Sequence, residues 1–401
     1  MPKPTPFHAR IQPLCESYDW SIWAGQYAVR AFDVCHEREY NAFRQATGVI
    51  DVSPLFKYDI RGPDAAQYLS WITVRDLSTL KVGRSTYLCW TDEQGKVIDD
   101  GTCSRIAEGH YRLTAAAPMH HWFTDNARGY TVTIEDVSER YAALAIQGPT
   151  SRDVLRSISR DIDVDGMRFF GVQEGMLAGI PAVVTRTGYT GDLGYELWVE
   201  QHHALTVWDA LFESGDRFGI HPAGLNALDV CRIEAGFLMM GVDYTGAFDA
   251  LIESQKSTPD ELGLGWMVKL ERSPFIGQSA LRDERKSGPS VSTVGLEIDW
   301  VALEELYGRH GLPAALPATA WRDSVPLYKS SRQVGRATSG SWSPILKKNL
   351  ALARVDSRHS KLGTCLDIEV TVEWARATVP ARVVKTPFYD PPQKKAVDSN
   401  V

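Results

Sequence analysis

"TRTGYTGDLGYELWVE", residues 185–200, places three glycines three residues apart between two apolar runs. Glycine permits positive φ and close backbone approach, so the stretch predicts two strands joined by a tight turn. Tyr189 and Asp192 lie in the turn, and Tyr195 and Glu196 lie in the second strand, where successive side chains point to opposite faces. Two interpretations stay open here: a plain hairpin turn, or the floor of a binding site.

Composition sets the outer limits of what the chain does. At 401 residues and 44% hydrophobic content, two or three globular domains are expected. The formal charge of -7, with lysines and arginines spread along the chain, argues against a nucleic-acid partner. No apolar run of about 18 residues and no signal-peptide core occurs, which predicts a cytoplasmic protein without a membrane span.

Metal and disulfide chemistry have weak support in the sequence. The six cysteines form neither a C-x-x-C pair nor a dense framework, so we expect reduced thiols. "HEREY" has Tyr40 where a zinc-protease motif needs its second histidine, and adjacent histidines on a helix do not converge on one ion. We therefore predict no metal site.

The order of elements shows a repeated unit. "YDIRGPDAAQYLSWI" (58–72) and "YAALAIQGPTSRDVLRSI" (141–158) each read as a strand, a Gly-Pro turn and a helix, with Asp64 a plausible N-cap in the first. Helical spacing also covers residues 31–46 and "ALDVCRIEAGFLMMG" (227–241). Beyond the polar stretch at 285–292, short alternating segments predict an all-β domain.

A pair of acids stands out in "GKVIDDG". Asp99 and Asp100 are consecutive in a predicted strand, so one carboxylate can be solvated while the other points inward. An inward carboxylate needs a partner or a chemical role. The structural alternative is an acid that caps the turn before Gly101.

These blocks together resemble the glycine-cleavage T-protein superfamily, the aminomethyltransferases and their relatives. The turn stretch resembles the family pattern T-G-Y-T-G-E-x-G-Y-E, and six further blocks stand in the family's order along the chain, among them "STYLCWTDEQGKVIDDG", "ALAIQGP" and "SGSWSPILKKNLALARV". The resemblance implies an α+β fold of three domains arranged like a clover leaf around a hole that admits tetrahydrofolate. The implied domains are residues 1–50 with 140–285 (folate-binding), 51–139 (a ferredoxin-like insertion) and 286–401 (a C-terminal β-barrel or jelly roll).

The resemblance also implies site residues. Glu196 matches the acid that pairs with the two adjacent N–H donors of the pterin edge, as an ionised carboxylate can. Tyr189, Tyr87 and Leu55 match positions that line the cofactor. Asp100 matches the catalytic carboxylate near folate N5 and N10, where it would stabilise developing positive charge or relay a proton. Asp192 ranks below Glu196, because the family pattern accepts either acid there.

Departures from the pattern favour the demethylase relatives over the true glycine-cleavage enzyme. Pro54 replaces a histidine, Leu228 replaces an arginine that packs on folate, and Ala116 replaces an asparagine; Met239 and Met240 stand where the family has Leu-Tyr. The segment "TPFYDPPQKK" (386–395) replaces one that bears an arginine. These changes weaken the aminomethyltransferase interpretation and leave the folate interpretation intact.

The N-terminal "SYDWSIWAGQY" brings several aromatic side chains together. Trp20, Trp23 and Tyr27 belong either to the core or to a pocket for an aromatic methyl ether, or for a sulfonium or quaternary ammonium held by cation–π attraction. The methyl donor, a small molecule, stays open between those classes.

The leading prediction is a tetrahydrofolate-dependent methyltransferase that demethylates a small O-, S- or N-methyl compound, with folate-recycling enzymes as partners. One alternative is an aminomethyltransferase that acts with a lipoyl carrier protein. Another is a non-enzymatic folate-binding accessory protein, although its K-G-C motif is absent from the sequence.

Overall fold

A computed structural model describes residues 1–317 and 319–397. Its largest sheet has seven strands in the order β10-β11-β12-β13-β9-β3-β14, antiparallel except for the β3–β14 pair. The motif at 185–200 joins two neighbouring strands near the middle of this sheet. The bounds are β3 Thr47–Asp51, β9 Tyr141–Gln147, β10 Ser159–Arg160, β11 Val172–Leu177, β12 Ile180–Thr185, β13 Gly194–Glu200 and β14 Ile220–Pro222.

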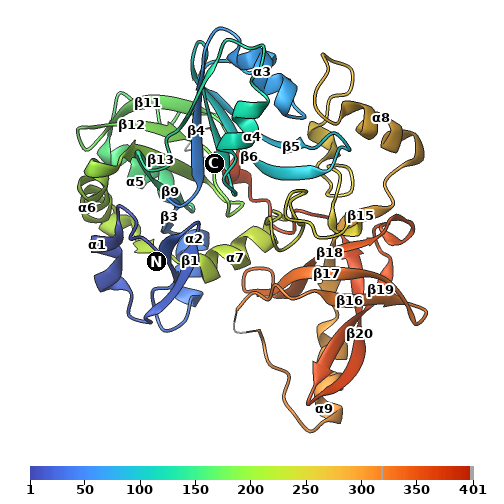
Figure 1. Ribbon diagram of the computed structural model, residues 1–401. Helices are drawn as coiled ribbons and strands as arrows, with labels where there is room; N and C mark the ends of the chain where they lie inside the picture. The colour runs from blue at the N-terminus through green and yellow to red at the C-terminus, as the bar shows by residue number, and fades with distance from the viewer. Residues whose placement is uncertain (318, 398–401) are drawn as a thin grey trace.

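Helices cover both faces of this sheet (Figure 1). Apolar side chains of α1, α5 and α6 pack on one face, and those of α2 and α7 pack on the other. A two-stranded hairpin, β1–β2, lies against the N-terminal end of α7. The bounds are α1 His8–Ile11, α2 Glu37–Gln45, α5 Ser151–Ile158, α6 Ala204–Gly215, α7 Leu225–Glu234, β1 Asp19–Trp23 and β2 Gln26–Ala31.

A second sheet of five strands, in the order β5-β6-β7-β4-β8, carries the pair of acids on its strand β6. Its core is rich in aromatic side chains and packs against α3 and α4. The bounds are β4 Phe56–Arg61, β5 Arg84–Thr91, β6 Val97–Ala107, β7 His110–Ala115, β8 Thr133–Asp136, α3 Ala65–Ile72 and α4 His120–Asp125.

The C-terminal strands form a closed barrel in the order β15-β18-β17-β16-β19-β20, sealed by pairing of β15 with β20. This confirms the predicted C-terminal β-barrel. Helix α7 packs against β17 and β18 and so connects the seven-stranded sheet to the barrel (Figure 1). The bounds are β15 Val291–Ile298, β16 Val325–Lys329, β17 Arg332–Ser343, β18 Lys348–Asp356, β19 Cys365–Val372, β20 Ala375–Val384, α8 Gln278–Ser287 and α9 Trp300–Arg309.

After β20 the chain does not end at the barrel. Residues 385–397 return to the seven-stranded sheet, where the Ala396 carbonyl accepts from Arg186. All six cysteines are free. Within residues 1–317 and 319–397, the helices are too short or too polar to cross a membrane.

The predicted α+β class and the repeated strand–turn–helix unit are confirmed: β4 precedes α3, and β9 precedes α5. The helix predicted over 31–46 is shorter: α2 begins at Glu37, after Ala31 has paired with Asp19 as the last residue of β2 and residues 32–36 have formed a turn. The predicted helix over 227–241 ends at Glu234, where Gly236 takes a positive φ of 68°. Asp64 is the N-cap residue of α3, as predicted, but its side chain accepts a hydrogen bond from the Thr131 N–H and makes none to the first turn of the helix. The three domain boundaries stay a prediction.

Candidate functional site

The glycine motif is wrapped around one glutamine side chain. Gln147, at the end of β9, donates from Nε2 to the Thr187 carbonyl at 3.2 Å and accepts from the Thr190 hydroxyl at 3.0 Å. A Cβ added at Gly188 would lie 2.0 Å from this side chain, and one at Gly194 would lie 2.3 Å from it. Gly191, at the tip, has a φ of 78°. The outer glycines are therefore required for close approach, and the middle glycine for its conformation.

Tyr189 leaves this turn and packs beside the predicted cofactor residues. Its ring stacks on Phe237 at a centroid distance of 5.5 Å, and its hydroxyl donates to the Leu238 carbonyl. It shares an apolar cluster with Leu55 and Leu228. Burial raises the pKa of Tyr189, so the phenol stays neutral and presents a ring edge and face rather than a charge.

Glu196 lies in β13 opposite Thr185 and is half-buried. Burial raises the pKa of Glu196 to about 6, while Thr187, Trp198 and the Lys57 ammonium act in the opposite direction. The Lys57 ammonium donates to the Leu55 carbonyl at 2.7 Å and so acts on Glu196 only through its charge. The carboxylate of Glu196 is thus ionised at neutral pH yet poorly solvated, which favours pairing with polar N–H groups of a ligand.

Leu55 lies on the turn between β3 and β4, and Lys57 fixes that turn. The Lys57 ammonium donates to the carbonyls of Ser53 and Leu55 at 2.9 and 2.7 Å. Burial lowers the pKa of Lys57 to about 8, with Asp51 acting in the opposite direction. One buried cation therefore holds the Leu55 turn close to Glu196.

Asp100, on β6, is held by two phenols. Tyr87 donates to Oδ2 at 2.7 Å from the neighbouring strand β5, and Tyr244 donates to Oδ1 from the segment after α7. Burial raises the pKa of Asp100, and the hydroxyls of Tyr244 and Tyr87 lower it. Hydroxyl donors favour the ionised carboxylate without placing a positive charge beside it.

Asp99 points to the opposite face of β6, as the strand periodicity predicted. Its carboxylate accepts hydrogen bonds from the N–H groups of Asp100 at 2.7 Å and of Ala116 and Ala117, both at 3.0 Å. Burial and the nearby Asp100 raise the pKa of Asp99 to about 8, and the three N–H donors lower it. Asp99 therefore anchors the loop after β7, while Asp100 faces the other side.

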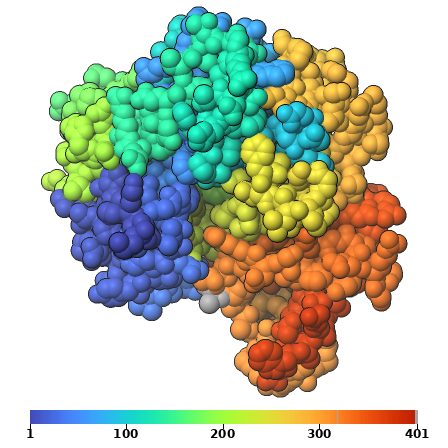
Figure 2. All heavy atoms as spheres, viewed as in Figure 1, coloured from blue at the N-terminus to red at the C-terminus, as the bar shows by residue number. Residues whose placement is uncertain are grey.

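The predicted cofactor residues fall into two adjacent groups. Tyr189 and Leu55 share the cluster beside α7, and Tyr87 packs in a second cluster with Tyr244. The charge of Asp100 raises the pKa of Tyr189, which places the two groups within electrostatic reach. Figure 2 shows a hollow near the centre of one face, between the blue N-terminal residues, the teal five-stranded sheet and the orange barrel.

The three aromatic residues of the N-terminal hairpin, Trp20, Trp23 and Tyr27, do not pack together in one cluster. Trp20 and Tyr27 meet edge to face at 6.3 Å, with His8 beside them, and Trp20 packs on the core under α6. Trp23 packs instead in the cluster that holds Leu55. Their role as a substrate pocket stays a prediction, and Trp23 is the member that lies with the cofactor residues.

The departures from the family pattern have local explanations. Ala116 contributes only its backbone N–H to Asp99, so its side chain is not needed there. Leu228 is buried on the α7 face that packs with Tyr189, and Met240 packs in the cluster of Tyr87. Pro54 lines a small cavity beneath the N-terminal hairpin.

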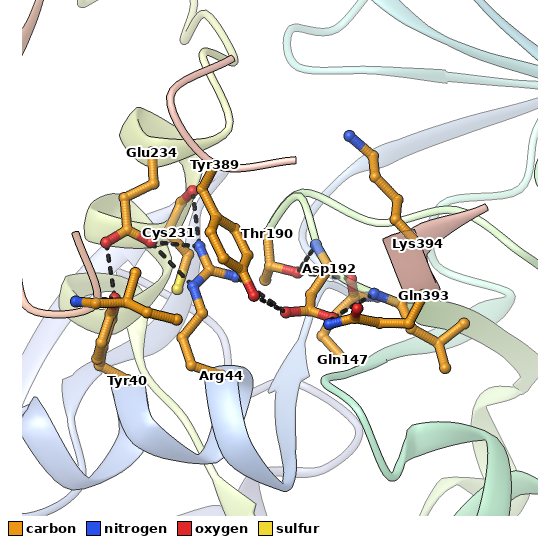
Figure 3. Close-up of polar contacts among 12 residues, drawn as sticks. Tyr40, Arg44, Gln147, Thr190, Asp192, Cys231, Glu234, Tyr389, Gln393 and Lys394 are labelled. Atoms are coloured by element: carbon orange, nitrogen blue, oxygen red, sulfur yellow. Dashed lines mark hydrogen bonds and ion pairs between the residues drawn. The ribbon is translucent and has the colours of Figure 1, made fainter. Parts of the chain in front are cut away.

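Sequence reasoning missed Tyr244 and the buried network around Asp192. Tyr244 comes from "MMGVDY", whose spacing shows no relation to a strand 144 residues earlier, so only the fold reveals its bond to Asp100. Asp192 lies in a buried network with Arg44, Tyr389 and Gln393 (Figure 3). The partners of Asp192 lie far away in the chain, so the motif alone gave no signal for this network.

Family models match most of the chain. The GCVT N-terminal domain matches residues 14–272, and the glycine cleavage T-protein C-terminal barrel domain matches residues 311–390. The structure is also similar to a solved one, that of the glycine cleavage system aminomethyltransferase T from Bartonella henselae. The TM-score is 0.82 at 23% sequence identity, and the similarity covers 97% of this chain and 99% of that one. This likeness shows the fold.

Curated relatives agree with the family models. The chain is 32% identical to an aminomethyltransferase of Bacillus subtilis over 88% of this chain and 90% of the relative. It is 34% identical to a trimethylamine-oxide aldolase of Ruegeria pomeroyi over 98% of this chain but 47% of the relative, so it spans about half that protein's length. Both relatives are named as enzymes. The chain belongs to the glycine cleavage T-protein (aminomethyltransferase) family.

Proposed function

We propose that the protein is a tetrahydrofolate-dependent transferase that moves a methyl group from a small O-, S- or N-methyl compound to N5 of tetrahydrofolate. The observation that carries the proposal is the carboxylate of Asp100, oriented by the hydroxyls of Tyr87 and Tyr244. A poorly solvated anion without a cationic partner is suited to stabilise positive charge on a bound reactant.

The side chains fit tetrahydrofolate by their chemistry. Glu196, half-buried and held near Thr187, would accept two N–H groups of the pterin edge. Tyr189, Tyr87 and Leu55 supply aromatic and apolar surface for the rings. When bound, tetrahydrofolate supplies a nucleophilic amine nitrogen, N5, that accepts the one-carbon unit.

The chain's own residues would then perform two tasks. Asp100 would hold negative charge where an amine becomes cationic, and one of its oxygens would accept the proton that the amine must lose. Tyr87 and Tyr244 would keep the carboxylate in one orientation through their hydrogen bonds. Because the phenols stay neutral, they cannot compete with Asp100 as the base.

The relatives direct the choice of donor. One is named for trimethylamine oxide and another for an aminomethyl group, and in both names the one-carbon group is attached to nitrogen. We therefore place N-methyl compounds first among the three donor classes. The proposed role of Asp100 does not depend on the donor class, since its carboxylate would suit a sulfonium or quaternary ammonium donor equally well.

Purified protein with tetrahydrofolate and a panel of methylamines, trimethylamine N-oxide, sulfonium compounds and methoxy-aromatic acids tests the proposal. Chromatography would quantify 5-methyl- and 5,10-methylene-tetrahydrofolate, with Asp100→Asn as the inactive variant and Lys286→Ala, which breaks an exposed ion pair, as the control. Methyl transfer that requires Asp100 supports the proposal. Folate binding with no turnover on any donor would favour the accessory-protein alternative.

A second candidate is aminomethyl transfer from a lipoyl carrier protein. Its support is the set of aminomethyltransferase relatives, which align over about nine-tenths of their own length. Formation of methylene-tetrahydrofolate from an aminomethyl-lipoyl carrier, with no product from the small-molecule panel, would select this function. Cell fractionation would test the cytoplasmic location, and co-purification would test the folate-recycling partners.

A further inference from the structure

The C-terminal segment, residues 386–396, forms a strap across the back of the glycine turn. Two arginines bind the strap by hydrogen bonds: Arg186, directly after β12, and Arg152, in helix α5. Arg186, at the start of the turn, donates from Nη2 to the carbonyls of Gln393, Lys394 and Ala396 at 3.2, 3.1 and 2.6 Å. Arg152, on α5, donates to the same Ala396 carbonyl at 2.8 Å. Terminal segments of a chain are usually poorly ordered unless they are tied down, and these hydrogen bonds tie the strap to the sheet.

Asp192 connects the tip of the turn to this strap. The hydroxyl of Tyr389 donates to Oδ2 and the amide of Gln393 donates to Oδ1, each at 3.2 Å (Figure 3). Arg44 lies 3.6 Å from the same carboxylate. Asp192 is fully buried, so it cannot serve as an exposed ligand group; its bonds are all directed within the protein.

Arg44 makes the network continuous from the turn to the barrel. Its guanidinium donates to Glu234 Oε2 at 2.6 and 2.9 Å, and the ring of Tyr389 covers it at 4.4 Å. Glu234 also accepts from Tyr40 and from Ser343, which lies at the end of β17. One buried cation thus pairs with a carboxylate from α7 and a carboxylate from the turn.

A second contact links the strap to Tyr189 indirectly, through Phe237. The Lys394 ammonium lies 5.3 Å from the Phe237 ring, and Phe237 stacks on Tyr189. The strap therefore supports the turn at its tip, through Asp192, and at the stacked partner of Tyr189. Both supports come from residues that lie about 200 positions later in the chain than the turn.

We propose that Arg44, Asp192 and Tyr389 are positioning residues that hold Tyr189 in its cofactor-binding geometry through the strap. This inference rests on the proposed folate binding. A turn with three glycines loses much conformational entropy when it is ordered, and a network that orders it beforehand removes that cost from ligand binding. By linkage, a bound ligand must in return stabilise the strap.

Two variants isolate the Asp192 contact. Tyr389→Phe keeps the ring over Arg44 and removes only the hydroxyl, and Asp192→Asn keeps the shape and removes the charge. Each should raise the Kd for tetrahydrofolate about tenfold or more, while kcat at saturating folate changes by less than about threefold. Tyr328→Phe, which removes a tyrosine–Glu369 hydrogen bond on the barrel, is the matched control and should leave both unchanged.

Limited trypsin digestion gives a readout that does not depend on turnover. Lys395 is exposed at the end of the strap, and tetrahydrofolate should slow cleavage there severalfold in the wild-type protein and much less in Asp192→Asn. An unchanged Kd in both variants, or strap cleavage that tetrahydrofolate does not slow, would overturn the inference. Failure of the wild-type protein to bind tetrahydrofolate would instead overturn the proposed function.

Discussion

The carboxylates of Asp100 and Asp192 each accept a hydrogen bond from a tyrosine hydroxyl, yet they differ in burial and in the charge beside them. Asp192 lies 3.6 Å from the Arg44 guanidinium and is fully buried. Asp100 is half-buried and accepts from two phenols, and within residues 1–317 and 319–397 it forms no ion pair. A carboxylate that a cation already neutralises stabilises structure, whereas one held by neutral donors can still act on a ligand.

Removing the cation from the Asp192 side should have the largest effect. Arg44→Met leaves Glu234 and Asp192 buried without a cation, which should lower the free energy of unfolding by about 3–5 kcal/mol. Urea denaturation followed by circular dichroism measures this. The matched control, Arg10→Met, breaks an exposed, solvent-screened pair with Asp209 and should change the free energy of unfolding far less. Equal losses in the two variants would contradict the assignment of Arg44.

Removing the charge on the Asp100 side should affect activity rather than stability. Asp100→Asn should lower kcat about 10²–10³-fold, with little change in the Kd for tetrahydrofolate or in the melting temperature. Steady-state kinetics with the best donor from the panel, together with calorimetric binding, would separate these quantities. Turnover near the wild-type value would place catalysis elsewhere.

Asp99 sharpens the comparison, because it is the neighbour of Asp100 in β6 but faces the other side and is held by backbone N–H groups. Asp99→Asn leaves at least one of its three N–H donors without an acceptor, so stability should fall by about 1–3 kcal/mol. Thermal and urea unfolding of the two neighbouring variants, measured side by side, checks this. A larger loss of kcat in Asp99→Asn than in Asp100→Asn would reverse the two assignments.

The smallest effect is expected from a single phenol. The Tyr244 hydroxyl lowers the pKa of Asp100, so Tyr244→Phe should raise that pKa. If ionised Asp100 is the active form, the acidic limb of the kcat profile shifts to higher pH, and kcat falls severalfold. The pH–rate profiles of wild type and Tyr244→Phe test the direction. A shift to lower pH would show that the phenol does not stabilise the anion.

Local sequence patterns were sufficient for most of the fold. The Gly-Pro turns after β4 and β9, the alternating strands of the barrel and the opposite orientations of Asp99 and Asp100 all follow from period and turn chemistry. The errors occurred where tertiary pairing overrode a local signal. Ala31, predicted as helical, pairs with Asp19 at the end of strand β2, and the Asp64 side chain accepts from the Thr131 N–H in place of the first turn of α3.

By itself, the sequence determined the family, the α+β class, the C-terminal barrel and the acids worth testing, because these depend on residue types at short, regular spacings. Only the tertiary structure decided that Asp100 is surrounded by neutral phenols and that Asp192 has a guanidinium beside it. Tyr244 reaches Asp100 from 144 residues away, and Tyr389 reaches Asp192 from 197 residues away. The electrostatic character of a buried carboxylate depends on groups within a few ångströms, and chain spacing carries no information about those neighbours.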